Sequence, residues 1–334
     1  MTTFDRRFKV NKLSKGVLGE HAWLCDLLCY WRPPGDEIEN HSCQQDAQQA
    51  AGPLEEPSKR LRLAIRNGYL NFYRGGQSVA RVDFDRSRNP QARIHNKYVY
   101  GDEGKGNSYV LLTAAGVPEL GTGQLASYDR ITHLDAWISN ANAYVGDEKR
   151  FVDDVVAWNP NVIDLEMGLP AYSSAPGERT APRMDLVALE PDRDTWKIVF
   201  WEAKLVSDGR ARCRGSEDPK VCKQLGNYTK WLGYGDNESF VKKAYQKACR
   251  ILVDLHNIAS RYSPDIGQLG EGIQAVAADG AALPGIDDKP RLLIDNREHD
   301  DSFTENGHLE KLLKVGLHVQ MVEGNGDMAL RAHP

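Results

Sequence analysis

The sequence feature that most constrains the fold is a β-hairpin predicted between residues 183 and 204. Two runs of mostly apolar residues in this segment flank a short turn that is rich in Pro and Asp. Such a pattern is typical of two antiparallel strands joined by a tight turn. A turn centred between Arg193 and Asp194 places Asp185 opposite or nearly opposite Glu202, at one end of the hairpin.

Charged residues at this end of the hairpin predict a cation site. Glu202 and Lys204 are two residues apart in one strand, so their side chains project from the same face. Two carboxylates and an ammonium beside an apolar core are costly unless something binds there. Two carboxylates held together favour a hard divalent cation such as Mg²⁺. A neighbouring lysine can orient or deprotonate a water, or stabilise a phosphate during reaction.

This arrangement resembles the signature of the PD-(D/E)XK nuclease superfamily, which has an Asp on one strand and Glu-x-Lys on the next. Asp185 and the triplet Glu202, Ala203 and Lys204 match that signature, although Met184 stands where the motif has Pro. The resemblance implies that Asp185 and Glu202 bind Mg²⁺, for which Mn²⁺ can substitute. It also implies that Lys204 positions or activates the attacking water.

A second element of the resemblance lies on a helix predicted after the hairpin. Gln224 and Tyr228 are four residues apart on one helical face and are similar to the QxxxY element of the RecB-like branch. The resemblance covers roughly residues 140 to 330. It implies that both residues organise the active site or contact the nucleic-acid backbone.

Two residues compete for the role of a third metal-binding acid. Glu148 lies in the second half of a helix predicted from Ser127 to about Trp158, which is broken near Gly146. There it shares a face with apolar residues at the spacing of a core-facing helix side. Glu166 lies in a strand predicted at 161–167. The sequence leaves both alternatives open.

A basic loop is predicted between Lys204 and Gln224. It carries Arg210, Arg212 and Arg214 close to the proposed site in sequence. Arginine side chains bind phosphate oxygens through pairs of N–H groups. We therefore expect these three residues to contact the nucleic-acid backbone.

The rest of the chain predicts two domains. Residues 1–126 form a β-rich N-terminal domain, in which residues 35–60 are poor in apolar residues and predict a flexible loop. Within it, an Asn-Gly turn at residues 67–68 predicts a hairpin. In residues 127–334, strands alternate with helices, which predicts an α/β fold with a mixed central sheet flanked by helices. The resemblance implies a restriction-endonuclease-like core for this second domain.

Composition limits the possible partners and compartment. The net charge of −5 provides no overall basic field, so nucleic acid must bind through a local patch. No apolar run is long enough for a membrane span. The six cysteines are scattered in a chain without a secretory pattern at its start, which predicts reduced thiols and a cytoplasmic protein.

Together these features predict a Mg²⁺-dependent deoxyribonuclease that acts in phage defence or DNA repair, with DNA as its partner. A helicase or ATPase partner and a homodimer are both compatible with the sequence. One alternative is a nucleic-acid-binding subunit that has lost catalysis. The other is a structural or interaction protein in which the charged residues form a buried ion network.

Overall fold

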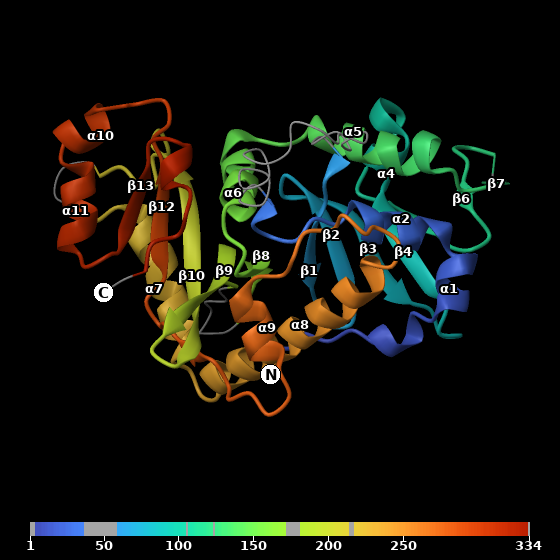
Figure 1. The fold of residues 1–334 in the computed structure, drawn as a ribbon. Coiled ribbons are helices and arrows are strands. Elements are labelled where there is room, and N and C mark those ends of the chain that lie inside the picture. The colour runs from blue at the N-terminus through green and yellow to red at the C-terminus, as the bar shows by residue number, and fades with distance from the viewer. Residues whose placement is uncertain are drawn as a thin grey trace, which may run out of the picture. The chain divides into compact units, whose positions relative to one another are not determined.

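The chain is a mixed α/β protein with an antiparallel N-terminal sheet and a second, mixed sheet accompanied by helices (Figure 1). The computed structural model describes residues 4–36, 59–104, 106–122, 124–171, 181–213 and 217–332. Most of the loop predicted at 35–60 lies outside these residues. This architecture confirms the expected α/β class and the β-rich N-terminal part.

Contacts within the chain divide it into two compact units. Unit 1 comprises residues 1–5, 147–250 and 270–334, and unit 2 comprises residues 6–146 and 251–269. The main division therefore falls after Gly146, whereas the sequence predicts a boundary after Ala126. The contacts also assign Ile251–Leu269 to unit 2, because the second part of one long helix and the segment after it pack there.

Unit 2 is built on a sheet in which each strand pairs with the next, in the order β1-β2-β3-β4-β5. The hairpin predicted at the Asn-Gly turn is confirmed, since Ile65 pairs with Leu70 and Gly68 has a φ of 90°, which glycine adopts without strain. The strands of this unit are β1 (Arg62–Ile65), β2 (Leu70–Arg74), β3 (Gln77–Phe84), β4 (Pro90–His95), β5 (Tyr109–Leu112), β6 (Val117–Pro118) and β7 (Leu125–Ala126). Its helices include α1 (Lys15–Glu20), α2 (Ala22–Tyr30), α4 (Asn96–Val99) and α5 (Ala136–Asn142).

One expectation about unit 2 is wrong in detail, and two boundaries there follow from local capping. Strand β4 ends at His95, whose ring accepts a hydrogen bond from the Lys97 N–H and starts α4. The helix predicted from Ser127 begins at Arg130 instead, because Asp129 caps it by accepting the Thr132 N–H at 2.9 Å. In both places a local side-chain cap sets the boundary.

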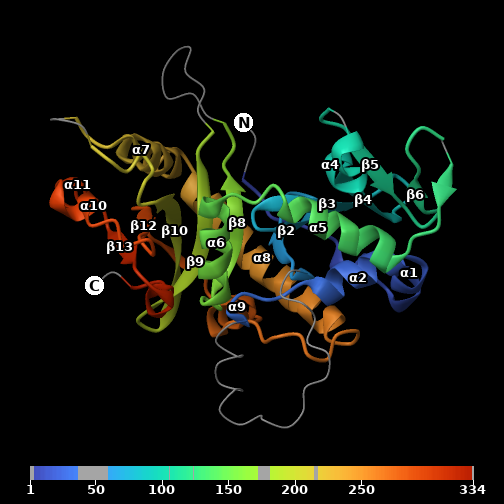
Figure 2. The ribbon, with the colours of Figure 1, turned by 90° about the horizontal axis from the view of Figure 1, so that it is seen from above.

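Unit 1 is built on a mixed sheet with strand order β13-β12-β10-β9-β8, which can be followed in Figures 1 and 2; β11 also pairs with β10. The strands β8, β9 and β10 are antiparallel, whereas β10 pairs with β12, and β12 with β13, in parallel. The strands are β8 (Val162–Gly168), β9 (Arg183–Asp192), β10 (Thr195–Leu205), β11 (Gly285–Ile286), β12 (Arg291–Asp295) and β13 (Val319–Val322). The helices are α6 (Asp147–Ala157), α7 (Lys220–Leu232), α8 (Asn237–Ala259, up to Arg250 in this unit), α9 (Glu271–Ala277), α10 (Ser302–Glu305) and α11 (His308–Lys314).

The β9–β10 hairpin forms the centre of this sheet with the predicted register. Thr195 pairs with Asp192 next to the turn, and Trp201 pairs with Leu186 at the other end. Ile198, Val199, Phe200 and Trp201 are buried, as are the apolar residues of β9 opposite them. Burial on both faces explains the continuous apolar runs in the sequence. The register brings Asp185 next to Glu202.

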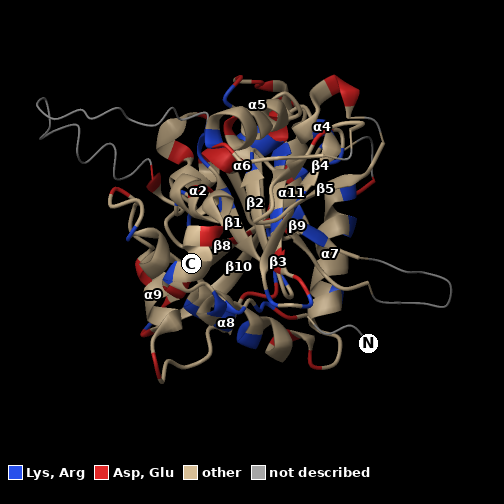
Figure 3. Cartoon of the chain, turned by 90° about the vertical axis from the view of Figure 1, so that its right-hand side faces the viewer, with Lys and Arg blue, Asp and Glu red and all other residues tan. Residues whose placement is uncertain are grey.

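Charge is distributed over both units. Figure 3 shows acidic and basic residues interspersed on the elements that face the viewer. In the part of the chain that the structure describes, no helix is both long and apolar enough to cross a membrane.

Candidate active site

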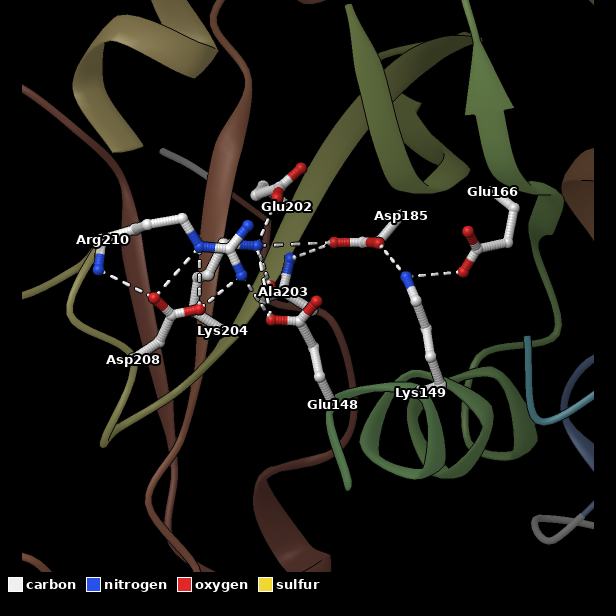
Figure 4. Close-up of polar contacts among 9 residues, drawn as sticks. All are labelled: Glu148, Lys149, Glu166, Asp185, Glu202, Ala203, Lys204, Asp208 and Arg210. Atoms are coloured by element: carbon white, nitrogen blue, oxygen red, sulfur yellow. Dashed lines mark hydrogen bonds and ion pairs between the residues drawn. The ribbon is translucent and has the colours of Figure 1, made fainter. Parts of the chain in front are cut away.

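Three charged residues that the sequence analysis selected meet at one end of the β9–β10 hairpin (Figure 4). Backbone pairing ends at Leu186 and Trp201. Just beyond it, Asp185 Oδ2 accepts a hydrogen bond from the Ala203 N–H at 3.0 Å. Asp185, Glu202 and Lys204 are only 7%, 3% and 1% exposed. These are charges held inside the protein, which requires each to have close partners.

Oxygen atoms surround the ammonium of Lys204. It forms a short ion pair with Glu202 and donates to the Ala203 carbonyl at 2.6 Å. Farther away are Glu148 Oε2 at 3.6 Å and Asp185 Oδ2 at 4.0 Å. Three carboxylates and one backbone carbonyl therefore converge on a single cation.

The first turn of α6 supplies two further members of the site. Glu148 contacts Lys204, as described above, and its neighbour Lys149 lies between two acids. The Lys149 ammonium is 2.7 Å from Asp185 Oδ1 and 2.6 Å from Glu166 Oε1. Both candidates for the third acid therefore lie at the site, Glu148 beside Lys204 and Glu166 beside Lys149.

Sequence reasoning missed Lys149, although the helix pattern carries a signal for it. Lys149 precedes the buried residues Val152 and Val156 by three and seven positions, so it shares a face with them. Glu148 shares a face with Phe151, Val152 and Val155 in the same way. The first turn of a helix with a wide apolar face can therefore direct two adjacent side chains to one site.

Glu166 lies next to Asp185 across β8 and β9. The flanking pairs are Leu165 with Leu186 and Met167 with Met184, which places Glu166 opposite Asp185. The φ of Glu166 is 51°, a left-handed conformation that is uncommon for a residue with a side chain. Such backbone strain persists only where the surrounding structure enforces it, and it is frequent at functional sites.

The three arginines of the basic loop have different environments. Arg210 is half exposed; it pairs with Asp208 and lies 3.2 Å from Glu148 Oε2. Arg212 points elsewhere: it bonds the Val206 carbonyl and Asp300. Arg214 lies outside the described residues. Of the two arginines that the structure describes in this loop, Arg210 therefore lies at the charged cluster. We define this cluster as Glu148, Lys149, Glu166, Asp185, Glu202, Lys204, Asp208 and Arg210.

Helix α7 lies along the face of β10 that carries Phe200 and Glu202. Gln224 lies close enough to Glu202 to lower the pKa of its carboxyl group, and one helical turn later the Tyr228 ring packs on Phe200 with centroids 4.5 Å apart. The four-residue spacing on the helix matches the two-residue spacing on the strand, since each spans roughly 6–7 Å. Tyr228 is fully buried, and its hydroxyl has no hydrogen-bonding partner among the described residues. Gln224 is therefore part of the site, and Tyr228 supports it by packing.

Burial and crowding of carboxylates change proton affinities in the cluster. Burial and the nearby Asp185 raise the pKa of Glu202 to about 7, although Lys204 and Gln224 act in the opposite direction. Burial also raises the pKa of Glu166. The cluster contains five carboxylates but only three cationic side chains. It therefore has an excess of negative charge when all the acids are ionised.

The donor atoms fit a hard divalent cation, but lysines occupy the positions between them. Mg²⁺ and Mn²⁺ prefer oxygen ligands. The cluster offers such ligands on Asp185, Glu202, Glu148 and the Ala203 carbonyl. Within the described ranges, no group of three or more His, Cys, Asp or Glu side chains is arranged to hold a metal ion as it stands. An ion that binds here requires the Lys204 ammonium to move.

A separate groove of about 740 Å³ lies near the turn end of β10. Two of its cationic side chains already have acidic partners, since Arg291 pairs with Glu190 and Asp287, and Lys197 with Glu190. The groove contains no member of the charged cluster. The cluster is therefore the stronger candidate for chemistry.

The chain matches no protein-family model, no curated protein and no solved structure. The geometry of the cluster is therefore the basis on which a function is assigned.

The buried hydroxyl of Tyr228 gives a first prediction. We expect Tyr228→Phe to leave the free energy of unfolding within about 1 kcal/mol of the wild-type value or to raise it, because no hydrogen bond is lost. The matched control is Tyr245→Phe, which removes a 3.0 Å hydrogen bond to the buried Asp164 and costs about 1.5–3 kcal/mol. Urea denaturation measures both. An equal loss in the two variants contradicts the placement of Tyr228.

The pKa of Glu202 gives a second prediction. Because folding raises this pKa from its ordinary 4.5 to about 7, the folded state holds the proton more tightly than the unfolded chain. The stabilisation is complete below pH 4.5 and is lost as the pH rises through 7. We expect the metal-free wild type to lose stability relative to Glu202→Gln between pH 4.5 and 8. Denaturation of both proteins in EDTA across this pH range measures their free energies of unfolding. A difference between wild type and Glu202→Gln that stays constant with pH contradicts the raised pKa.

Proposed function

We propose that this chain is a metal-dependent nuclease of the PD-(D/E)XK type that hydrolyses phosphodiester bonds in DNA. One observation carries the proposal: Asp185, Glu202 and Lys204 meet, buried, at the end of adjacent strands in a mixed sheet. Glu148 from α6 and Gln224 from α7 reach the same cluster. The mixed sheet with its central hairpin and helices is also what a restriction-endonuclease-like core requires.

The side chains suggest a division of roles. Asp185, Glu202, Glu148 and the Ala203 carbonyl would hold Mg²⁺ or Mn²⁺. A bound cation polarises the phosphate and lowers the pKa of water. Lys204 would position the attacking water or stabilise the charge that develops on the phosphate. Gln224 would hold the Glu202 carboxylate, and Arg210, which is half exposed, would contact the nucleic-acid backbone.

The charge of the cluster supports cation binding. Its carboxylates outnumber its cations by two when all are ionised, so one divalent ion would neutralise the excess. Electrostatic interactions are stronger at buried positions than in water. A cation held there would act on a substrate phosphate at close range, where water screens it little.

One observation favours a second candidate, a nucleic-acid-binding subunit without catalysis. Four acids of the cluster each contact a lysine ammonium: Asp185, Glu202, Glu148 and Glu166. The Lys204 ammonium lies between Glu202 and Glu148. Acids that already have lysine partners do not need a metal ion to be paired. Metal-dependent cleavage separates the two candidates.

A third prediction tests the nuclease directly. We expect the purified protein to cut linear, circular or single-stranded DNA with Mg²⁺ or Mn²⁺ and to be inactive in EDTA. Lys204→Met keeps much of the side-chain volume but removes the charge, so the rate should fall by a factor of about 10² to 10⁴. Lys230→Met, at an exposed position of α7, should leave the rate unchanged.

Circular dichroism and thermal melting of each variant establish that it is folded before rates are compared. Full activity in folded Lys204→Met would remove the proposed role of this lysine. Tight DNA binding by the wild type without any cleavage would favour the non-catalytic subunit instead.

A further inference from the structure

Asp185 is shared by two ammonium groups, one on each side of its carboxylate. On one side, the ammonium of Lys149 lies 2.7 Å from Oδ1 and 2.6 Å from Glu166 Oε1. On the other side, the ammonium of Lys204 lies 4.0 Å from Oδ2 and bonds Glu202. Across three neighbouring strands, carboxylates and ammonium groups therefore alternate: Glu166, Lys149, Asp185, Lys204 and Glu202 (Figure 4).

The two cation positions differ in their surroundings. The Lys204 ammonium has four oxygen neighbours. They are Glu202, the Ala203 carbonyl at 2.6 Å, Glu148 at 3.6 Å and Asp185 at 4.0 Å. The position of Lys149 offers two carboxylate oxygens, both at ion-pair distance, and no other described contact. The first position therefore offers four oxygen ligands to a cation, and the second offers two.

We propose that Lys149 is a positioning residue that fills the place of a second metal ion, so that the site takes one divalent cation, on the Lys204 side of Asp185. This inference rests on the proposed metal-dependent function. It assigns Lys149 two tasks: it fixes the orientation of the Asp185 carboxylate, and it supplies a permanent positive charge beside the cation.

Two features of the structure support this role. Lys149 projects from the first turn of α6 with its side chain 26% exposed, so the helix anchors it while its ammonium reaches the acids. Glu166, which pairs with Lys149, has a left-handed φ of 51°. Such a strained conformation persists only where the surrounding structure enforces it, so this acid is held in place.

Metal stoichiometry tests the inference without reference to activity. Isothermal titration with Mn²⁺, checked by the electron paramagnetic resonance signal of bound Mn²⁺, should give one ion per wild-type chain. Lys149→Met removes the ammonium and leaves Asp185 and Glu166 uncompensated, so the stoichiometry should rise to two. Lys149→Arg keeps the charge and should still give one. Adding Glu166→Gln to Lys149→Met should return it to one.

The outcomes separate this inference from the proposed function. A folded Lys149→Met that still binds one ion, or a wild type that binds two, overturns the role of Lys149 and leaves the nuclease proposal standing. A wild type that binds none overturns the metal site itself. If Lys149→Met does not fold without metal, Lys149→Gln replaces it, because a neutral amide can still hydrogen-bond both acids. We again expect two bound ions per chain. A folded Lys149→Gln that binds one ion overturns the inference.

Discussion

The structure of the site depends on the two-sided pairing of the Asp185 carboxylate. One oxygen accepts the Ala203 N–H, where β9 and β10 stop pairing, and the other bonds the Lys149 ammonium from α6. Taking a charge out of water costs several kcal/mol unless its partners are in place, and removing one partner leaves the other uncompensated. The hairpin, β8 and α6 must therefore all be positioned before this end of the sheet can be buried.

Helix α7 adds a second, apolar constraint on the same strand. The packing of Tyr228 on Phe200 sets the helix along β10, and this places Gln224 at Glu202 one turn away. The apolar contact thus determines a polar one. Burial and Asp185 raise the pKa of Glu202. The ionised form of this carboxyl group therefore destabilises the folded state relative to its protonated form. A cation that binds there reduces this destabilisation, which links the stability of the folded chain to its proposed chemistry.

Much of the site could be predicted because it depends on local patterns. The apolar runs and the turn between Arg193 and Asp194 determine the register, and the register brings Asp185 to Glu202. Helical spacing places Gln224 and Tyr228 on one face of a helix, and the family resemblance relates that face to the site. What could not be predicted depends on how separate elements pack. Lys149 reaches Asp185 only because of where α6 lies. Arg212 does not contact the charged cluster, because it forms an ion pair with Asp300. The buried hydroxyl of Tyr228 likewise has no signal in the sequence.

A crystal structure of the chain grown with Mn²⁺ tests the central claim most directly. We predict one anomalous-scattering peak within coordination distance of Asp185, Glu202 and the Ala203 carbonyl, with the Lys204 ammonium displaced from its present contacts. Lys149 should keep its bonds to Asp185 and Glu166. An absence of any peak there, with Lys204 still bonded to Glu202 at saturating Mn²⁺, would contradict the account and leave the cluster as a structural ion network.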